Sequence, residues 1–169
     1  MARFTSIIFG LVGYLVVASC AAPTSSDFGI GDILNLLKLG LVTKINAIIT
    51  TDSFITNEIS INFDIKNPLI LDLTIDSIAS QAGLNGTVYS TFNHTFTPPL
   101  VVPILGSINS GNISHVSLVK GLTGSLDIIP YGVLDLISTD VNIRVLGIPI
   151  PITGLKQDGV PTTYDLSVS

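Results

Sequence analysis

The stretch EISINFDIKNPLILDLTID, from Glu58 to Asp76, alternates apolar and polar residues, breaks at Asn67-Pro68 and then alternates again. Because successive side chains of an extended strand point to opposite faces, the alternation predicts two strands, each buried on one side. Pro68 has no backbone N–H and disfavours helical geometry at Asn67, so we expect the chain to turn or bulge there. Half-buried strands of this kind indicate an antiparallel sheet with one solvated face. The apolar row of the first strand is Ile59, Ile61, Phe63 and Ile65.

Strand signals continue along most of the chain after Leu41, separated by turn sequences such as Asn85-Gly86, Pro98-Pro99 and Asp158-Gly159. Many short strands with regular turns are typical of a sandwich or a barrel. Before them, GDILNLLKLG predicts a short amphipathic helix with Asp32 as N-cap and Gly40 as terminator. The predicted strands cover residues 41–50, 54–66, 69–80, 86–96, 114–120, 125–129, 140–146 and 148–157.

The first residues, MARFTSIIFGLVGYLVVASCAAP, have the layout of a secretory signal: Arg3, an apolar core, then small residues. We expect cleavage to leave a mature start near Ala21 or Ala22. Two alternatives remain: the uncharged run 4–22 has 19 residues, enough for a membrane anchor, and Val17–Cys20 reads as a bacterial lipobox. We favour cleavage, because Arg3 alone is weak support for an anchor. We therefore divide the chain into a signal peptide (1–21), a segment with the short helix (22–40) and one domain (41–169).

The composition is unusually apolar: charged residues make up 11% of the chain, and the formal net charge is −5. Nucleic acid is not an expected partner, because phosphate neutralisation needs clustered Lys and Arg, and the basic residues here are scattered. Cys20 is the only cysteine, so the mature chain forms no disulfide and no thiolate metal site. Such a chain either fills its core or exposes apolar surface for binding or assembly.

The sequence offers little catalytic chemistry. His94 and His115 have no second metal-binding residue at a suitable spacing, and no nucleophile elbow or phosphate loop is present. We therefore predict no catalytic residue, no metal site and no cofactor. Asn85, Asn93 and Asn112 begin Asn-x-Ser/Thr sequons and are candidate glycosylation sites on a eukaryotic secretory route.

Several segments resemble the late embryogenesis abundant group 2 domain, also called the water stress and hypersensitive response domain. They are the strand ending at Asn67-Pro68, LDLTIDSIASQAGLNGTVYSTFNHTF, SLDIIPYGVLDL, DVNIR and IPIPITGLKQDGVPTTY, within residues 41–164. The chain is more similar to an uncharacterised fungal family of secreted or vacuolar proteins that carries this type of domain. The resemblance implies an all-β, antiparallel fibronectin- or immunoglobulin-like sandwich of about seven or eight strands, with one short N-terminal helix and no catalytic residues or cofactor.

The resemblance also bears on location and ligand. Relatives often sit behind an N-terminal membrane anchor, and some are thought to hold lipid or another apolar ligand. The basic cytoplasmic tail of the anchored plant relatives is missing here, since only Arg3 precedes the apolar run. We therefore expect a secreted protein, with the vacuolar lumen or an uncleaved anchor as alternatives.

Two segments are apolar on both phases: PPLVVPILG, residues 98–106, and VLGIPI, residues 145–150. Their prolines remove ladder donors, so we expect them at sheet edges or in loops. Either the N-terminal helix covers one of them, or they border a groove for an acyl chain or apolar partner, or they mediate self-association. The candidate apolar-ligand surface is Leu100, Val102, Ile104, Leu105, Leu146, Ile148 and Ile150.

The expected function is thus that of a non-enzymatic secreted domain that binds lipid or another apolar ligand, or protects surfaces under water stress. The alternative is a structural or adhesive cell-surface protein that self-assembles through its apolar face.

Overall fold

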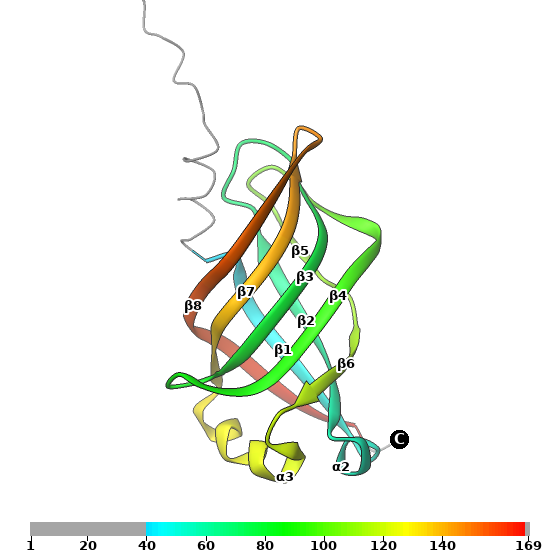
Figure 1. Cartoon of the computed structure of the whole chain (residues 1–169), viewed down its shortest axis with the longest axis vertical. Helices are drawn as coiled ribbons and strands as arrows, with labels where there is room; N and C mark the ends of the chain where they lie inside the picture. The colour runs from blue at the N-terminus through cyan, green and yellow to red at the C-terminus, as the bar shows by residue number, and fades with distance from the viewer. Residues whose placement is uncertain (1–39, 168–169) are drawn as a thin grey trace, which may run out of the picture.

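A computed structural model describes residues 40–167, which form a closed β-barrel (Figure 1). Its ring runs β1–β8–β7–β3–β4–β6–β2 and closes because β2 also pairs with β1. The short β5 pairs with β2 beside the ring. The strands are β1 (Val42–Thr50), β2 (Glu58–Lys66), β3 (Leu73–Leu84), β4 (Thr87–Val102), β5 (Ser107–Asn109), β6 (Ile113–Leu118), β7 (Val133–Val145) and β8 (Ile148–Ser167).

The expectation of an antiparallel sandwich is wrong, because one strand joins what would be two sheets. β8 first pairs antiparallel with β7 and then runs parallel to β1, from Ile45 opposite Thr162 to Thr50 opposite Ser167. The predicted turn at Asp158-Gly159 does not end this strand, which continues to Ser167 as part of the barrel wall (Figure 1). Closure through this parallel pair makes the sheet a mixed barrel with no separate second layer.

Other predicted elements also differ. The segment 125–129 is helical, in α3 (Gly121–Ser125) and η1 (Leu126–Tyr131), and α2 (Ser53–Thr56) precedes β2. β4 continues through Pro98-Pro99, where its register with β3 shifts, because a bulge tolerates the missing N–H groups. The predicted helix within residues 30–40, the signal sequence and the segment boundary at residue 21 lie outside the described residues, apart from Gly40.

The alternation of β2 is confirmed. Its four predicted apolar residues are all buried in the barrel, and the polar residues between them are partly exposed. The chain leaves the ladder at Asn67-Pro68 as expected and rejoins it at Leu73. One face of every long strand therefore points into a shared interior, which holds the core. The most deeply buried apolar side chains are Leu69, Leu73, Val102, Ile113, Val116, Ile143 and Val160.

Candidate functional site

The barrel interior contains an apolar cavity beside α3 and η1. The volume open to the centre of a water molecule is about 60 Å³. One water needs roughly 10–15 Å³ in this measure, so the cavity has room for several waters or a small apolar molecule. Its lining combines strand and helix residues, among them Ile45, Ala47, Ile61, Ala82, Leu122 and Ile128.

A second cavity, of about 40 Å³, lies farther along the interior. Its lining includes Leu41, just before β1, and Ile65, near the end of β2. The two cavities share lining residues, namely Val42, Phe63, Ile78 and Leu136. The two cavities are therefore neighbours along the barrel interior.

One polar group in the first cavity stands out. Among the buried side-chain polar atoms of residues 40–167, only the Tyr164 hydroxyl has no hydrogen-bond partner. The hydroxyls of Ser80 and Thr139 satisfy each other at 2.7 Å, and Ser125 Oγ donates to the Gly121 carbonyl at 2.7 Å. Burial raises the pKa of Tyr164 to about 12, so the hydroxyl keeps its proton at physiological pH. The Tyr164 hydroxyl is therefore a hydrogen-bond donor in an apolar site that offers it no acceptor.

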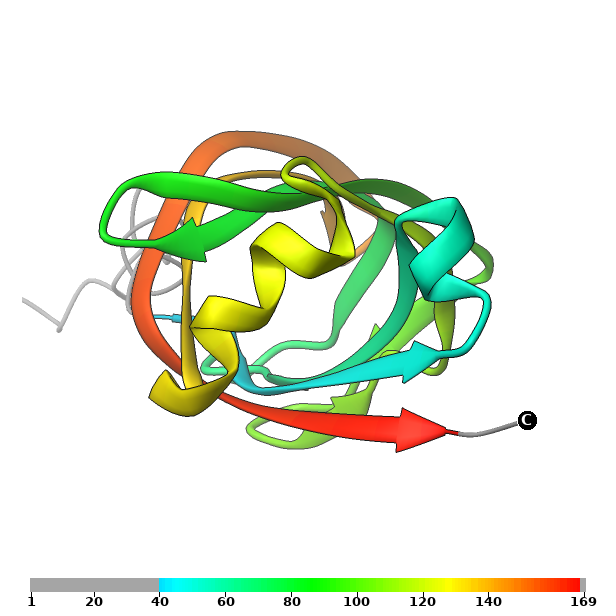
Figure 2. The same cartoon turned by 90° about the horizontal axis from the view of Figure 1, so that it is seen from below.

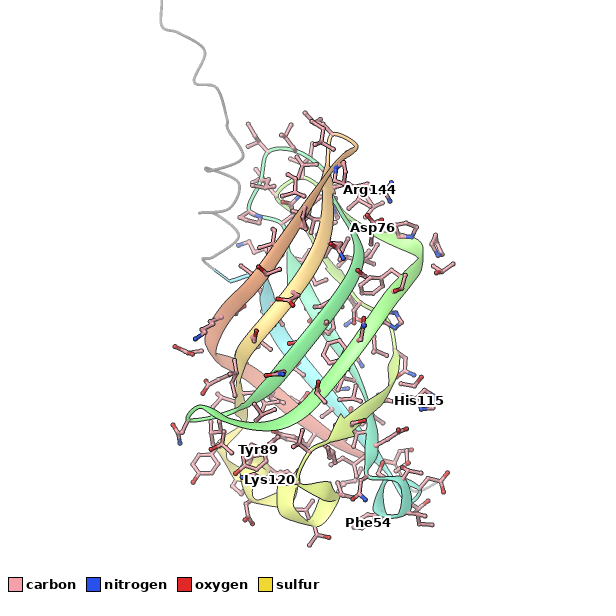
Figure 3. The ribbon with its side chains drawn as sticks, in the orientation of Figure 1. Phe54, Asp76, Tyr89, His115, Lys120 and Arg144 are labelled. Carbon is pink, nitrogen blue, oxygen red and sulfur yellow. The ribbon has the colours of Figure 1, made fainter. Side chains whose placement is uncertain are left out.

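Helical segments close this end of the barrel. α3 and η1 lie across the opening, as the view from below shows (Figure 2). Asn57, in the left-handed region (φ 56°), accepts the Leu122 N–H on its side-chain oxygen at 2.9 Å and the Leu118 N–H on its carbonyl at 2.9 Å. Lys120 stands over the Tyr89 ring, 4.3 Å from its centroid (Figure 3). We call this the capped end.

The seam between β1 and β8 is closed by a side chain at its other end. The parallel ladder begins at Ile45, and before it the Gln157 amide bridges to Val42, donating to its carbonyl and accepting its N–H. Gln157 and the exposed Lys156 both line the second cavity. The second cavity therefore lies directly behind a stretch of the wall that lacks a backbone ladder.

The predicted apolar-ligand surface divides between core and surface. Val102 and Ile150 are buried, because they lie on the inward phase of their strands, and Leu100 is half-buried. The first residue of β3, Leu73, pairs with Val102 on one side and with Val145 on the other, which brings the two predicted segments to one end of the barrel. Exposed aliphatic side chains gather there, and we call them the apolar tip: Ile70, Val101, Ile104, Leu105, Leu146 and Ile148.

The histidines and acids lie outside the interior. His115 Nδ1 is 2.8 Å from Glu58 Oε2 on the outer surface, and His94 packs edge-on against Phe96 (Figure 3 labels His115). Asp76, also outside the interior, accepts two hydrogen bonds from Arg144. Within residues 40–167 no three His, Cys, Asp or Glu side chains converge as a metal site would require. The same residues include no helix long and apolar enough to cross a membrane.

The three sequon asparagines, Asn85, Asn93 and Asn112, are all exposed. Asn85 lies in the β3–β4 turn, Asn112 in the segment before β6, and Asn93 in β4. Their glycosylation stays a prediction.

Sequence reasoning missed Tyr164, because the last predicted strand ends at residue 157. A signal was available: Val160, Thr162 and Tyr164 continue the period of two that marks a strand with one buried face.

In sequence, the chain matches no family model and no curated protein. The solved structures that are similar in part include the following two. One is a crystal structure of a protein from Archaeoglobus fulgidus, with 12% identity over 61% of this chain and 83% of that chain and a TM-score of 0.35. The other is a solution structure of a protein from Arabidopsis thaliana, with 15% identity over 75% of this chain and 83% of that chain and a TM-score of 0.37. Likenesses this distant carry no argument about function, and membership of the late embryogenesis abundant group 2 family stays a hypothesis.

Proposed function

We propose that the barrel interior binds a small lipid-like molecule, with an aliphatic chain and one hydrogen-bond acceptor. The observation that carries the proposal is the unpartnered Tyr164 hydroxyl inside an apolar cavity. A buried hydroxyl without a partner costs roughly 1–3 kcal/mol, which a ligand oxygen at this place would recover. An apolar pocket with a few convergent polar groups is the usual form of a small-molecule site.

The chemistry of the ligand follows from the lining. Tyr164 stays protonated below about pH 12, so it donates to a carbonyl, carboxylate or hydroxyl oxygen. The neighbouring hydroxyls of Ser80 and Ser125 are already hydrogen-bonded within the protein. The site therefore suits a ligand with one hydrogen-bond acceptor, whereas a strongly polar ligand would bury further polar groups without partners. The second cavity extends the apolar space beyond Phe63, which favours a chain over a compact ring.

The proposal is tested by filling the cavity. Organic extraction of the purified protein and titration with an environment-sensitive fatty-acid probe measure bound lipid and probe affinity. Ala82 is buried in the cavity lining, and Ala79 lies on the outer face of the same strand. We expect Ala82→Leu to weaken the probe at least about tenfold, because the larger side chain occupies the space, and Ala79→Leu to leave its affinity unchanged.

A saturable site that is insensitive to Ala82→Leu would place binding elsewhere. If the wild-type chain carries no lipid and binds no probe, the interior is simply an imperfectly packed core. Tyr164→Phe provides a second test. It should lower the affinity for a fatty-acid or fatty-alcohol probe more than the affinity for a plain alkane, because only the oxygenated ligands lose a hydrogen-bond donor.

A further inference from the structure

The apolar tip is held by a rigid scaffold. Asn67 is fully buried at its base, and its side-chain amide donates to the carbonyls of Leu71, Val102 and Pro103 at 2.8–3.1 Å. Its side-chain oxygen accepts the Leu69 N–H at 2.9 Å. The backbone adds bonds between the same two loops: the Asn67 N–H donates to the Gly106 carbonyl and the Leu105 N–H to that of Leu69. The exposed aliphatics are thus presented by ordered loops, since the loops that carry them are tied together.

Two leucines of the tip occupy backbone positions that suit other residues. Leu105 and Leu146 have φ angles of 50° and 53°, in the left-handed region, and are 60% and 74% exposed. A leucine there is strained, whereas Asn or Gly is tolerated, and neither leucine gains burial in return. Strain combined with exposure is what a contact residue shows when its partner is outside the chain.

A second hairpin in the same barrel has the same turn geometry with a different residue at the first position. The β3–β4 turn at Asn85-Gly86 has φ angles of 50° and 76°, and the β7–β8 turn at Leu146-Gly147 has 53° and 79°. Both are two-residue hairpin turns with positive φ at both positions, for which Asn-Gly is the favoured sequence. The backbone therefore does not require leucine at the tip.

The charges around the tip indicate what covers it. The segments that form it, residues 66–76, 100–109 and 144–150, contain Lys66, Asp72, Asp76 and Arg144, which sum to zero, and the last two pair with each other. An anionic surface therefore has no basic cluster to recognise here. The chain also enters the barrel near this end, because the Leu41 carbonyl accepts the Lys66 N–H at 2.8 Å. The chain that precedes residue 40 therefore joins the barrel on the tip side, and in an uncleaved chain it carries the uncharged run 4–22.

We propose that the apolar tip docks on the surface of a bilayer with zwitterionic headgroups, with Leu105 and Leu146 inserting below the headgroups. This docking is independent of a ligand in the barrel. It orients the long axis of the barrel toward the membrane and places the capped end away from it.

The test uses tryptophan as a reporter, because the natural chain contains none. In the full chain, Ile148→Trp places the reporter at the tip, and Leu166→Trp places it on an exposed residue at the far end of β8. With phosphatidylcholine vesicles whose acyl chains are brominated, we expect the tip reporter to shift to the blue and be quenched, and the far reporter to stay unchanged. A tip reporter that is not quenched overturns the proposal, as does equal quenching at both positions.

Replacement of both leucines then tests the contact residues. In the Ile148→Trp chain, Leu105→Asn with Leu146→Asn should lower vesicle partitioning, read at the reporter, by about tenfold or more, because burial of even one leucine is worth about that factor. Val119→Asn, an exposed aliphatic next to α3, should leave it unchanged. Asn fits the left-handed backbone, so a thermal melt should show the double variant folded. If residues 4–22 bind the vesicle by themselves, partitioning no longer depends on the tip, and the quantity compared is then quenching at the tip reporter, which senses insertion of the tip itself.

Three further results would overturn the proposal. Quenching that requires phosphatidylserine and falls with salt would indicate electrostatic docking. A blue shift that grows with protein concentration without quenching would show that a second copy covers the tip. Undiminished quenching in the double Asn variant would mean that other residues insert.

Discussion

The two ends of the barrel use the same hairpin turn with opposite side chains. At the capped end the turn is Asn85-Gly86, and the hydrogen-bonded segment α3–η1 lies across the barrel opening (Figure 2). At the other end the turn is Leu146-Gly147, and exposed aliphatics surround it. The difference shows that neither the backbone geometry of the turn nor packing within the chain requires a leucine at position 146. The capped end is built to enclose an interior, and the apolar tip is built to present a surface.

Each end depends on one asparagine, and the two can be compared directly. Asn67→Ala should lower the free energy of unfolding by about 3 kcal/mol, because three carbonyls and one N–H lose their partner in a buried site. Asn57→Ala should cost about 1–2 kcal/mol, because one N–H bond and a favourable left-handed residue are lost near the surface. Urea denaturation measures both. Equal costs would contradict the view that the tip is the more tightly tied end.

How much of this could be predicted depends on whether the signal is local. The alternation that predicted β2 works because the strand has one buried face, which the sequence records residue by residue, whereas the second predicted strand began at residue 69, four residues before β3 does. The pairing of Ile45 with Thr162 is not recorded in that way, because the partners lie far apart in the chain and a parallel pair leaves no turn between them. The closed barrel therefore could not be distinguished from a sandwich by periodicity alone.

The helical segments α3 and η1 illustrate a second limit of prediction from the sequence. Residues 121–131 contain three isoleucine or threonine residues, two glycines and a proline, which favour strand or turn. Burial of Leu122 and Ile128 against the barrel interior overrides this preference. Four of the seven residues of the candidate surface, Ile104, Leu105, Leu146 and Ile148, are exposed and lie in the apolar tip, and their role in binding stays a prediction. The interior cavities depend on how side chains from many strands meet, so no local pattern could reveal them.

The capped half also contains Tyr164, whose burial makes the stability of the protein depend on alkaline pH. The pKa of Tyr164 is about 12 in the folded protein, against about 10 in an unfolded chain. Between these values the unfolded state releases the proton and the folded state keeps it, so stability is present below pH 10 and falls as pH rises toward 12. The full difference corresponds to about 2.7 kcal/mol. Because Tyr164 is only half-buried, solvent screening reduces the expected loss to about 1–2 kcal/mol. Tyr164→Phe should remove this part of the alkaline loss. Identical profiles for the wild type and Tyr164→Phe would show that the Tyr164 hydroxyl is not desolvated in solution.

The smallest effect addresses the two turns themselves. Leu146→Asn should raise the free energy of unfolding by about 0.5–1 kcal/mol, because Asn tolerates the left-handed backbone and the replaced side chain is exposed. Asn85→Leu should lower it by a similar amount in protein made without glycosylation, since the backbone bond from the Asn85 N–H to Asp135 is retained. Chemical denaturation with an unchanged denaturant slope is the measurement. Opposite signs would establish that the leucine at the tip is kept at a cost to stability, as a docking residue requires. If Leu146→Asn instead destabilises the barrel, the leucine has a packing role in the folded chain, and the contrast between the two ends loses its functional meaning.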